Sequence, residues 1–248
     1  MKELADEGVV LRTYSSGEAD RVVVLWTKHS GKVRLLARGV RRTSSRMGGA
    51  LEPLARVKVD AVQSRGALYV TRHVAHVERY ETIRTDYERI LAGLSVIEAI
   101  DAIPLDDFAD AELYELLIRV LRTLDDPSFS PALVAPAFFA RLLVHDGVAP
   151  ELFACAQCAS EGPLVAFHAP SGGALCGGCR TGRVISAEAL ALARRMLGGD
   201  LAGVLRESHP AGETEITLLL TEAVEDHLGR RLKSARAALE STTTRTVR

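Results

Sequence analysis

Residues 21–38, with the sequence RVVVLWTKHSGKVRLLAR, decide how the first part of this chain folds. Residues 21–27 are rich in valine and contain a tryptophan, a composition typical of a β-strand, and residues 28–31 (KHSG) are typical of a hairpin turn. In residues 32–38, Val33, Leu35 and Ala37 alternate with mostly basic residues, and this period of two indicates a returning strand. The stretch therefore predicts a hairpin with one apolar face and one face that carries Lys32, Arg34 and Arg38.

Further strand-like stretches flank this hairpin. Residues 8–11 precede it, and residues 57–63 and 67–76 follow it around a Ser-Arg-Gly turn. Five short antiparallel strands within about 75 residues fit a small closed barrel, and the OB-fold is the common five-stranded barrel. We therefore expect residues 1–80 to form an OB-fold domain.

From residue 81 the apolar residues recur at spacings of three and four, which is typical of helices. This pattern covers residues 87–100, 113–124 and 138–143. Asp110 and Ser186 are placed to start helices, and residues 218–239 read as a single last helix. We predict an α+β chain whose helical domain comes in two parts, 81–150 and 184–240, before a disordered tail at 241–248.

Charge is unevenly distributed along the 248 residues, although the formal net charge is only −1. Residues 1–80 hold 15 Lys and Arg against 8 Asp and Glu, whereas residues 81–150 hold 5 against 13. Between Asp20 and Glu52 there is no carboxylate, and this interval holds eight cations: Arg21, Lys28, Lys32, Arg34, Arg38, Arg41, Arg42 and Arg46.

This basic stretch predicts a polyanion as partner, nucleic acid first. Its loop, residues 39–50, is rich in glycine, serine and arginine, so it can follow a phosphate backbone. The alternative is a solvated strand face that only aids solubility. Few aromatic residues are available for stacking on bases, so we expect sequence-independent, salt-sensitive binding through phosphates; they are Tyr14, Trp26, Tyr69 and Tyr80.

All four cysteines lie in the segment 151–183, as two Cys-x-x-Cys pairs. The pairs, Cys155 with Cys158 and Cys176 with Cys179, are separated by 17 residues. This spacing predicts a zinc ribbon in which four thiolates fill a tetrahedral site, so the zinc is structural and has no open position for a catalytic water. The alternative is four reduced thiols without metal. His168 lies between the pairs, and we expect it to be hydrogen-bonded rather than a ligand.

Known catalytic patterns are missing from the sequence. It has no GxxxxGK[ST] nucleotide loop, no GxSxG and no HExxH, so we expect no enzyme. Neither a signal peptide nor a run of about 20 apolar residues is visible, so we expect a soluble, cytoplasmic protein without a membrane partner. Two other classes stay open: a scaffold that docks an acidic protein, and a zinc enzyme acting on nucleic acid.

Four stretches of the chain, taken in order, carry a family resemblance. They are ExDRVVxLxT from residue 18, followed by GKV, AxGxRR and Ser45; the LL at 142–143 with GxxPEL from residue 147 leading into the first Cys-x-x-Cys; GGxLC from residue 172; and LGRRLKS from residue 228. Together they resemble the RecO family of bacterial recombination mediators, from near residue 5 to residue 240.

The resemblance implies a DNA repair protein without an enzymatic centre. Members have an OB-fold, a helical body and, in many cases, a zinc ribbon. They bind single- and double-stranded DNA and anneal complementary strands, including strands coated by single-strand DNA-binding protein, and with RecR they help to load RecA. By resemblance the DNA-contacting residues are Arg34, Arg38, Arg41, Arg42 and Arg46, followed by Arg21 and Lys32.

Overall fold

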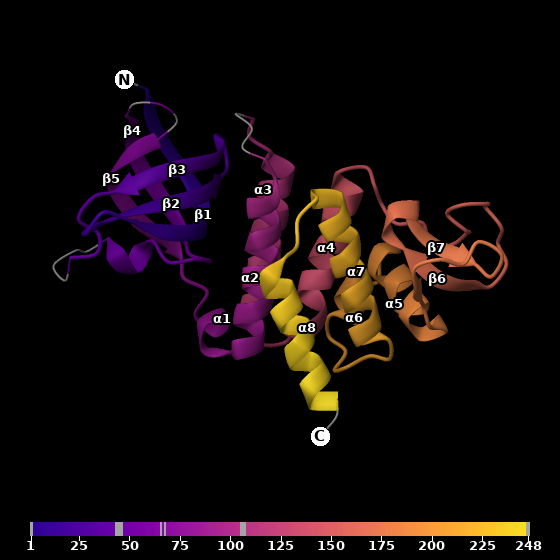
Figure 1. Cartoon of the computed structure of the whole chain (residues 1–248). Coiled ribbons are helices and arrows are strands. Elements are labelled where there is room, and N and C mark those ends of the chain that lie inside the picture. The colour runs from indigo at the N-terminus through magenta and orange to yellow at the C-terminus, as the bar shows by residue number, and fades with distance from the viewer. Residues whose placement is uncertain (1, 43–46, 65, 67, 105–107, 247–248) are drawn as a thin grey trace. The chain divides into compact units, whose positions relative to one another are not determined.

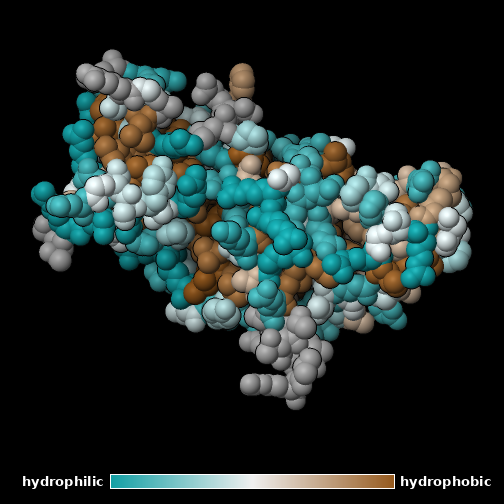
Figure 2. All heavy atoms as spheres, viewed as in Figure 1, coloured by the Kyte–Doolittle hydropathy of each residue, from teal (hydrophilic) through white to brown (hydrophobic). Residues whose placement is uncertain are grey.

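The computed structural model describes residues 2–42, 47–64, 66, 68–104 and 108–246, with side chains as far as Glu240 (Figure 1). These residues form two compact units. Unit 1 consists of Met1–Glu81 and Ile100–Arg122, and unit 2 consists of Thr82–Ala99 and Thr123–Arg248. Residues 100–122 thus group with the N-terminal strands, whereas the sequence predicts a domain boundary at residue 80. Hydrophilic side chains cover most of the face drawn in Figure 2, with hydrophobic residues showing between them.

Unit 1 contains the predicted closed barrel of five strands. In spatial order the strands run β1-β2-β3-β5-β4, and β1 closes the barrel by pairing with β4. Two details differ from the expectation: β3 and β5 are parallel, and β1 is much longer than residues 8–11. The strands are β1 (Glu3–Ser16), β2 (Asp20–Thr27), β3 (Gly31–Ala37), β4 (Arg56–Gln63) and β5 (Leu68–Glu78).

In the hairpin formed by residues 21–38, the alternation of apolar residues determines which side chains of β2 and β3 point into the barrel. Val23, Leu25 and Leu35 are fully buried and belong to the core inside the barrel. The opposite face is also covered in part, because Val24 and Trp26 are only 0% and 4% exposed. The hairpin therefore has two apolar faces near its turn, which the period of two did not indicate.

The predicted helical stretches 87–100, 113–124 and 138–143 lie within α2, α3 and α4, whereas the short helices α1 and α6 were not predicted. An Asp110 carboxylate oxygen accepts a hydrogen bond from the Leu113 N–H at 2.8 Å, and the Ser186 hydroxyl accepts one from the Ala189 N–H at 3.1 Å, so both predicted caps are confirmed. The helices are α1 (Glu81–Thr85), α2 (Tyr87–Ala102), α3 (Ala111–Asp125), α4 (Val134–His145), α5 (Ala187–Leu197), α6 (Leu201–Val204), α7 (Glu213–Leu228) and α8 (Lys233–Thr246), with short 3₁₀ turns η1 (Gly48–Ala50), η2 (Pro131–Leu133) and η3 (Ala169–Ser171).

The prediction of one continuous helix over residues 218–239 is wrong. Helix α7 ends at Leu228, because the next residue, Gly229, has a left-handed φ of +60°, and the Arg230 N–H donates to the Glu225 carbonyl at 3.1 Å. Helix α8 then starts anew, capped by Glu98, which accepts from the Lys233 and Ser234 N–H groups. It continues to Thr246, so most of the expected disordered tail is helical; residues 247–248 lie outside the described part.

A small three-stranded sheet lies between α4 and α5 in the chain. Its strands are β6 (Leu164–His168), β7 (Gly173–Cys176) and β8 (Arg183–Val184), in the order β7-β6-β8. It carries the cysteine pairs described below. Among the described helices, none has both the length and the apolar character that a membrane crossing requires.

Candidate nucleic-acid interface and metal centre

The basic stretch of the sequence does not form one continuous cationic surface, because carboxylates from other segments reach several of its members. Arg21 lies 3.0 Å from a carboxylate oxygen of Glu52, just beyond the acid-free interval. Lys28 lies 3.3 Å from a carboxylate oxygen of Glu115 on α3. The charges of these two cations are therefore balanced within unit 1.

Lys32 is buried and does not lie on a surface that DNA could reach, which corrects its predicted exposure. Only 6% of the residue is exposed, and its ammonium donates to the carbonyls of Asp101, at 2.9 Å, and Ile103. Because helix α2 ends here, these carbonyls lack intrahelical partners, and the lysine satisfies them. Arg34, on the same face, is half-buried, and its Nε has no hydrogen-bond partner among the described residues.

Three arginines of the loop after β3 are exposed, namely Arg38, Arg41 and Arg42. We call residues 38–42 the arginine loop. Val40, between them, is only 4% exposed and packs into the barrel core, which turns its neighbours toward solvent. The loop is thus anchored by one buried side chain and displays three guanidinium groups.

Two backbone N–H groups of the arginine loop donate hydrogen bonds to the start of β2 and to the turn between β1 and β2. The Gly39 N–H donates to an Asp20 carboxylate oxygen at 2.7 Å, and the Arg41 N–H donates to the Ala19 carbonyl at 2.9 Å. Gly39 has a φ of +63°, a conformation that favours glycine. Asp20, the last carboxylate before the acid-free interval, therefore holds the loop in place by bonding its backbone.

Within the described residues, no carboxylate forms an ion pair with Arg38, Arg41 or Arg42. The strongest side-chain contact of the three is a long one, 3.4 Å, from Arg41 to the Gly17 carbonyl. Arg46, the remaining predicted member, lies outside the described residues. An exposed guanidinium without a counter-ion is suited to bind phosphate in a bidentate manner.

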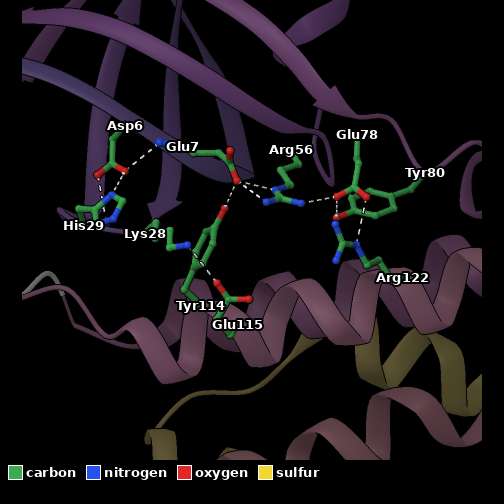
Figure 3. A network of polar contacts seen from close by, with 10 residues as sticks. All are labelled: Asp6, Glu7, Lys28, His29, Arg56, Glu78, Tyr80, Tyr114, Glu115 and Arg122. Atoms are coloured by element: carbon green, nitrogen blue, oxygen red, sulfur yellow. Dashed lines mark hydrogen bonds and ion pairs between the residues drawn. The ribbon is translucent and has the colours of Figure 1, made fainter.

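A second group of charges in unit 1 is instead paired internally (Figure 3). We call it the arginine network. Arg56 donates to Glu7 at 2.7 Å and to Glu78 at 2.6 Å, and Arg122 donates to Glu78 at 3.0 Å. The Tyr114 hydroxyl donates to Glu7 at 3.0 Å. No local sequence pattern indicates this network, because its hydrogen-bonded partners lie up to 107 residues apart in the chain.

The arginine network shifts the pKa of Glu78. Burial alone would raise the pKa of this carboxyl group, but hydrogen bonds from Arg56 and Arg122 outweigh burial and leave the pKa below its usual value. Glu78 is therefore ionised at neutral pH and holds two guanidinium groups.

The four cysteines come together as the sequence predicted. Their Sγ atoms all lie within 4.8 Å of one another, and all four are free thiols. The Cys158 and Cys176 Sγ atoms, one from each pair, are 3.7 Å apart. A tetrahedral zinc with Zn–S bonds of about 2.3 Å would separate its sulfurs by about 3.8 Å, so the cluster has the dimensions of a metal site.

The electrostatics of the cluster also favour a bound cation. The backbone N–H of Cys176 lowers the pKa of the Cys155 thiol to about 6, whereas a hydrogen bond with Cys158 raises the pKa of Cys179 to about 12. Sulfurs this close repel one another when ionised, and a divalent cation removes that repulsion. His168 takes no part in the cluster, because its Nδ1 lies 2.8 Å from the Ser171 hydroxyl, as expected for a hydrogen-bonded histidine.

The backbone around the first cysteine pair is fixed by Glu151. Its carboxylate accepts from the N–H groups of Phe153 and Ala154, which lowers the pKa of Glu151. Gly173, with φ of +151°, passes so close to Glu151 that an added Cβ would lie 2.2 Å from the Glu151 carbonyl oxygen. A glycine is therefore required at the start of the strand that carries Cys176.

Comparison with known proteins covers nearly the whole chain. Residues 1–80 match the family described as Recombination protein O N terminal, and residues 84–236 match Recombination protein O C terminal. The DNA repair protein RecO of Streptomyces coelicolor is 38% identical over 246 residues, which cover 95% of this chain and 98% of that protein. The protein of the same name from Streptomyces griseus is 39% identical over 212 residues, 82% of this chain and 85% of that protein.

Proposed function

The chain belongs to the RecO family, and on that premise we propose that it acts in DNA repair as a non-catalytic mediator of recombination. It binds single- and double-stranded DNA through phosphates, without regard to sequence. The observation that carries this proposal is the arginine loop, where Arg38, Arg41 and Arg42 are exposed and without ion-pair partners in the described structure. Further proposed DNA contacts are Arg34, Arg46 and, once it is released from Glu52, Arg21.

Strand annealing follows from the same chemistry. Phosphates on two strands repel each other, and a protein that neutralises both lowers that repulsion and raises the local strand concentration. No nucleotide hydrolysis is needed for this step. We propose that the chain anneals complementary strands, including those coated by single-strand DNA-binding protein, and that with RecR it helps to load RecA. These partners come from the family resemblance.

The four-cysteine cluster holds zinc in this proposal, with Cys155, Cys158, Cys176 and Cys179 as ligands. Four thiolates complete a tetrahedral shell, so the zinc stabilises the ribbon and takes no part in chemistry on DNA. Replacing Cys155 by Ser should remove the metal, measured as zinc per chain, and lower the melting temperature. Loss of DNA binding at an unchanged melting temperature would contradict a purely structural zinc. Loss of a turnover activity with the fold intact would support the alternative, a zinc-dependent nucleic-acid enzyme.

The experiment that tests DNA binding compares two triple variants of equal charge. One is Arg38→Ala/Arg41→Ala/Arg42→Ala. The control, Lys2→Ala/Lys58→Ala/Arg72→Ala, removes three exposed cations elsewhere on the same barrel. Affinity for labelled random-sequence oligonucleotides, single- and double-stranded, and the annealing rate of complementary strands are measured at low salt.

We expect the loop variant to bind both kinds of DNA at least tenfold more weakly than the wild type and to anneal slowly, because three phosphate contacts are lost. The control should stay within a few-fold of wild type. Wild-type protein that binds no DNA at low salt would refute the proposal and leave the arginine loop to an acidic protein partner.

A further inference from the structure

We propose that Tyr14 and Arg12, on the outer face of the barrel, form a stacking site for one unpaired base of single-stranded DNA. The inference rests on the proposed DNA-binding function and deepens it. It identifies a feature by which this barrel distinguishes a single strand from a duplex.

The register between β1 and β2 places both side chains outside the barrel. Thr13 pairs with Val23, which lies in the barrel core, so its neighbours in β1 point outward. Arg12 pairs with Val24 and Tyr14 pairs with Val22. An irregularity in the pairing between Val10 and Arg12 resets the alternation, which is why the outward positions in this half of β1 are not evident from the sequence.

Among residues 1–80, Tyr14 is the aromatic residue that offers its ring to solvent, with 43% of the residue exposed. The other three aromatic residues considered for stacking are enclosed: Trp26 is 4% exposed, Tyr69 8% and Tyr80 4%. On the described part of the barrel, Tyr14 is therefore the aromatic side chain that a base of single-stranded DNA can reach.

Arg12 and Asp101 hold the Tyr14 ring in place. The Arg12 guanidinium carbon lies 5.5 Å from the ring centroid, a cation–π arrangement. Arg12 Nε donates to a carboxylate oxygen of Asp101 at 2.6 Å, and the Asp101 side chain is only 6% exposed. The buried carboxylate thus fixes the guanidinium, and the guanidinium covers one side of the ring. A base stacked on the exposed side would complete a three-layer stack.

The stacking site lies near the arginine loop. Strand β1 ends two residues after Tyr14, at Ser16, which pairs with Asp20, and Asp20 accepts the Gly39 N–H at 2.7 Å. From strand geometry the Cα atoms of Tyr14 and Arg38 are about 12 Å apart, two strands across and two residues along. A single strand with phosphates on the arginine loop can therefore lay a neighbouring base on Tyr14.

A duplex has no free base to offer, because its bases are paired and stacked on one another. The stacking site therefore adds affinity for single strands alone, and it does so without neutralising a phosphate. The arginine loop acts on both kinds of DNA and sets the salt dependence. Selectivity for single strands and salt dependence therefore distinguish the contribution of the stacking site from that of the arginine loop in binding experiments.

The test uses Tyr14→Ala and Tyr14→Phe in the full chain, with anisotropy of a labelled oligothymidine and of a random duplex. We expect Tyr14→Ala to weaken single-strand binding by about 5-fold to 150-fold, from the usual range of base–aromatic stacking. Duplex affinity and the salt slope should match wild type. Tyr14→Phe, which keeps the ring, should bind single strands like wild type.

A direct signature is available from 2-aminopurine, whose fluorescence is quenched by stacking. A single strand with one 2-aminopurine should be quenched by wild type and by Tyr14→Phe, but less by Tyr14→Ala. Equal single-strand affinity for wild type and Tyr14→Ala, or equal weakening on duplex, would overturn the stacking site while leaving the proposed function intact. Wild type that binds neither DNA would refute the proposed function and the stacking site with it.

Discussion

Two groups of arginines in unit 1 contrast with each other. In the arginine network, Arg56 and Arg122 donate to Glu7 and Glu78, and the Arg56 side chain is only 15% exposed. In the arginine loop, residues 38–42, the three guanidinium groups face solvent and form no ion pair within the described structure. The residue type is the same, but the available counter-ions differ.

The contrast separates a structural use of arginine from a binding use. A partly buried guanidinium with two carboxylates is already neutralised, so a phosphate could replace those partners only at a large electrostatic cost. An exposed guanidinium without a partner loses little on meeting a phosphate, and counter-ions are released when it does. The network should therefore control stability, and the loop should control DNA binding.

The largest expected effect is on stability, from breaking the arginine network. Arg56→Ala leaves Glu7 and Glu78 without their shared partner and should lower the free energy of unfolding by about 3 kcal/mol. Urea denaturation at pH 7 measures it. Arg72→Ala is the control, because its ion pair with Glu3 is mostly exposed, and it should cost less than about 1 kcal/mol. Equal losses in the two variants would remove the distinction between buried and exposed pairs.

The pH dependence of stability should carry the signature of Glu78. Its pKa is lowered in the folded state, so its contribution is fully present above the unfolded pKa of about 4.3 and is lost as the pH falls through the lower folded value. Denaturation midpoints from pH 7 to pH 3 should fall more steeply in wild type than in Glu78→Gln. Parallel curves would show that the arginines do not stabilise the ionised form.

The arginine loop should be nearly neutral for stability. Arg38→Ala/Arg41→Ala/Arg42→Ala removes no ion pair of the described structure and leaves Val40 in the core, so the free energy of unfolding should change by less than about 0.5 kcal/mol. The same urea series gives the value. A loss as large as that of Arg56→Ala would mean that the loop holds the barrel together.

The smallest effect is expected from a substitution that leaves a paired arginine without its partner. Glu52→Gln releases Arg21 from its 3.0 Å contact, and Arg21 lies on β2 near the arginine loop. The salt slope of duplex binding should steepen by at most about 0.9, the value for one phosphate contact. An unchanged slope would place Arg21 outside the DNA path.

Local patterns in the sequence predicted much of the fold and the four cysteines of the candidate metal site. The valine-rich hairpin indicated the barrel, and the two Cys-x-x-Cys pairs indicated a cluster that four sulfurs within 4.8 Å confirm. Both predictions depend on patterns formed by residues close together in the sequence. The break between α7 and α8 was missed because Gly229 lies within an otherwise helical apolar pattern.

Partners distant in the chain limited the prediction of the interface. The interval from residue 21 to 51 contains no carboxylate, yet Glu115 and Asp101 reach Lys28 and Lys32 from residues 100–122. Charge counting along the chain does not register such contacts. The outward position of Tyr14 depends in the same way on strand register, and the position of the Arg12 guanidinium beside it depends on Asp101, 89 residues from Arg12.

The most direct test of the central claim is the slope of log affinity against log salt for duplex DNA. Wild type, the loop variant Arg38→Ala/Arg41→Ala/Arg42→Ala and the control Lys2→Ala/Lys58→Ala/Arg72→Ala are measured side by side. If the arginine loop binds phosphates, the loop variant loses up to about three units of slope and the control loses less than about one. Equal slopes in the loop variant and wild type would contradict the account.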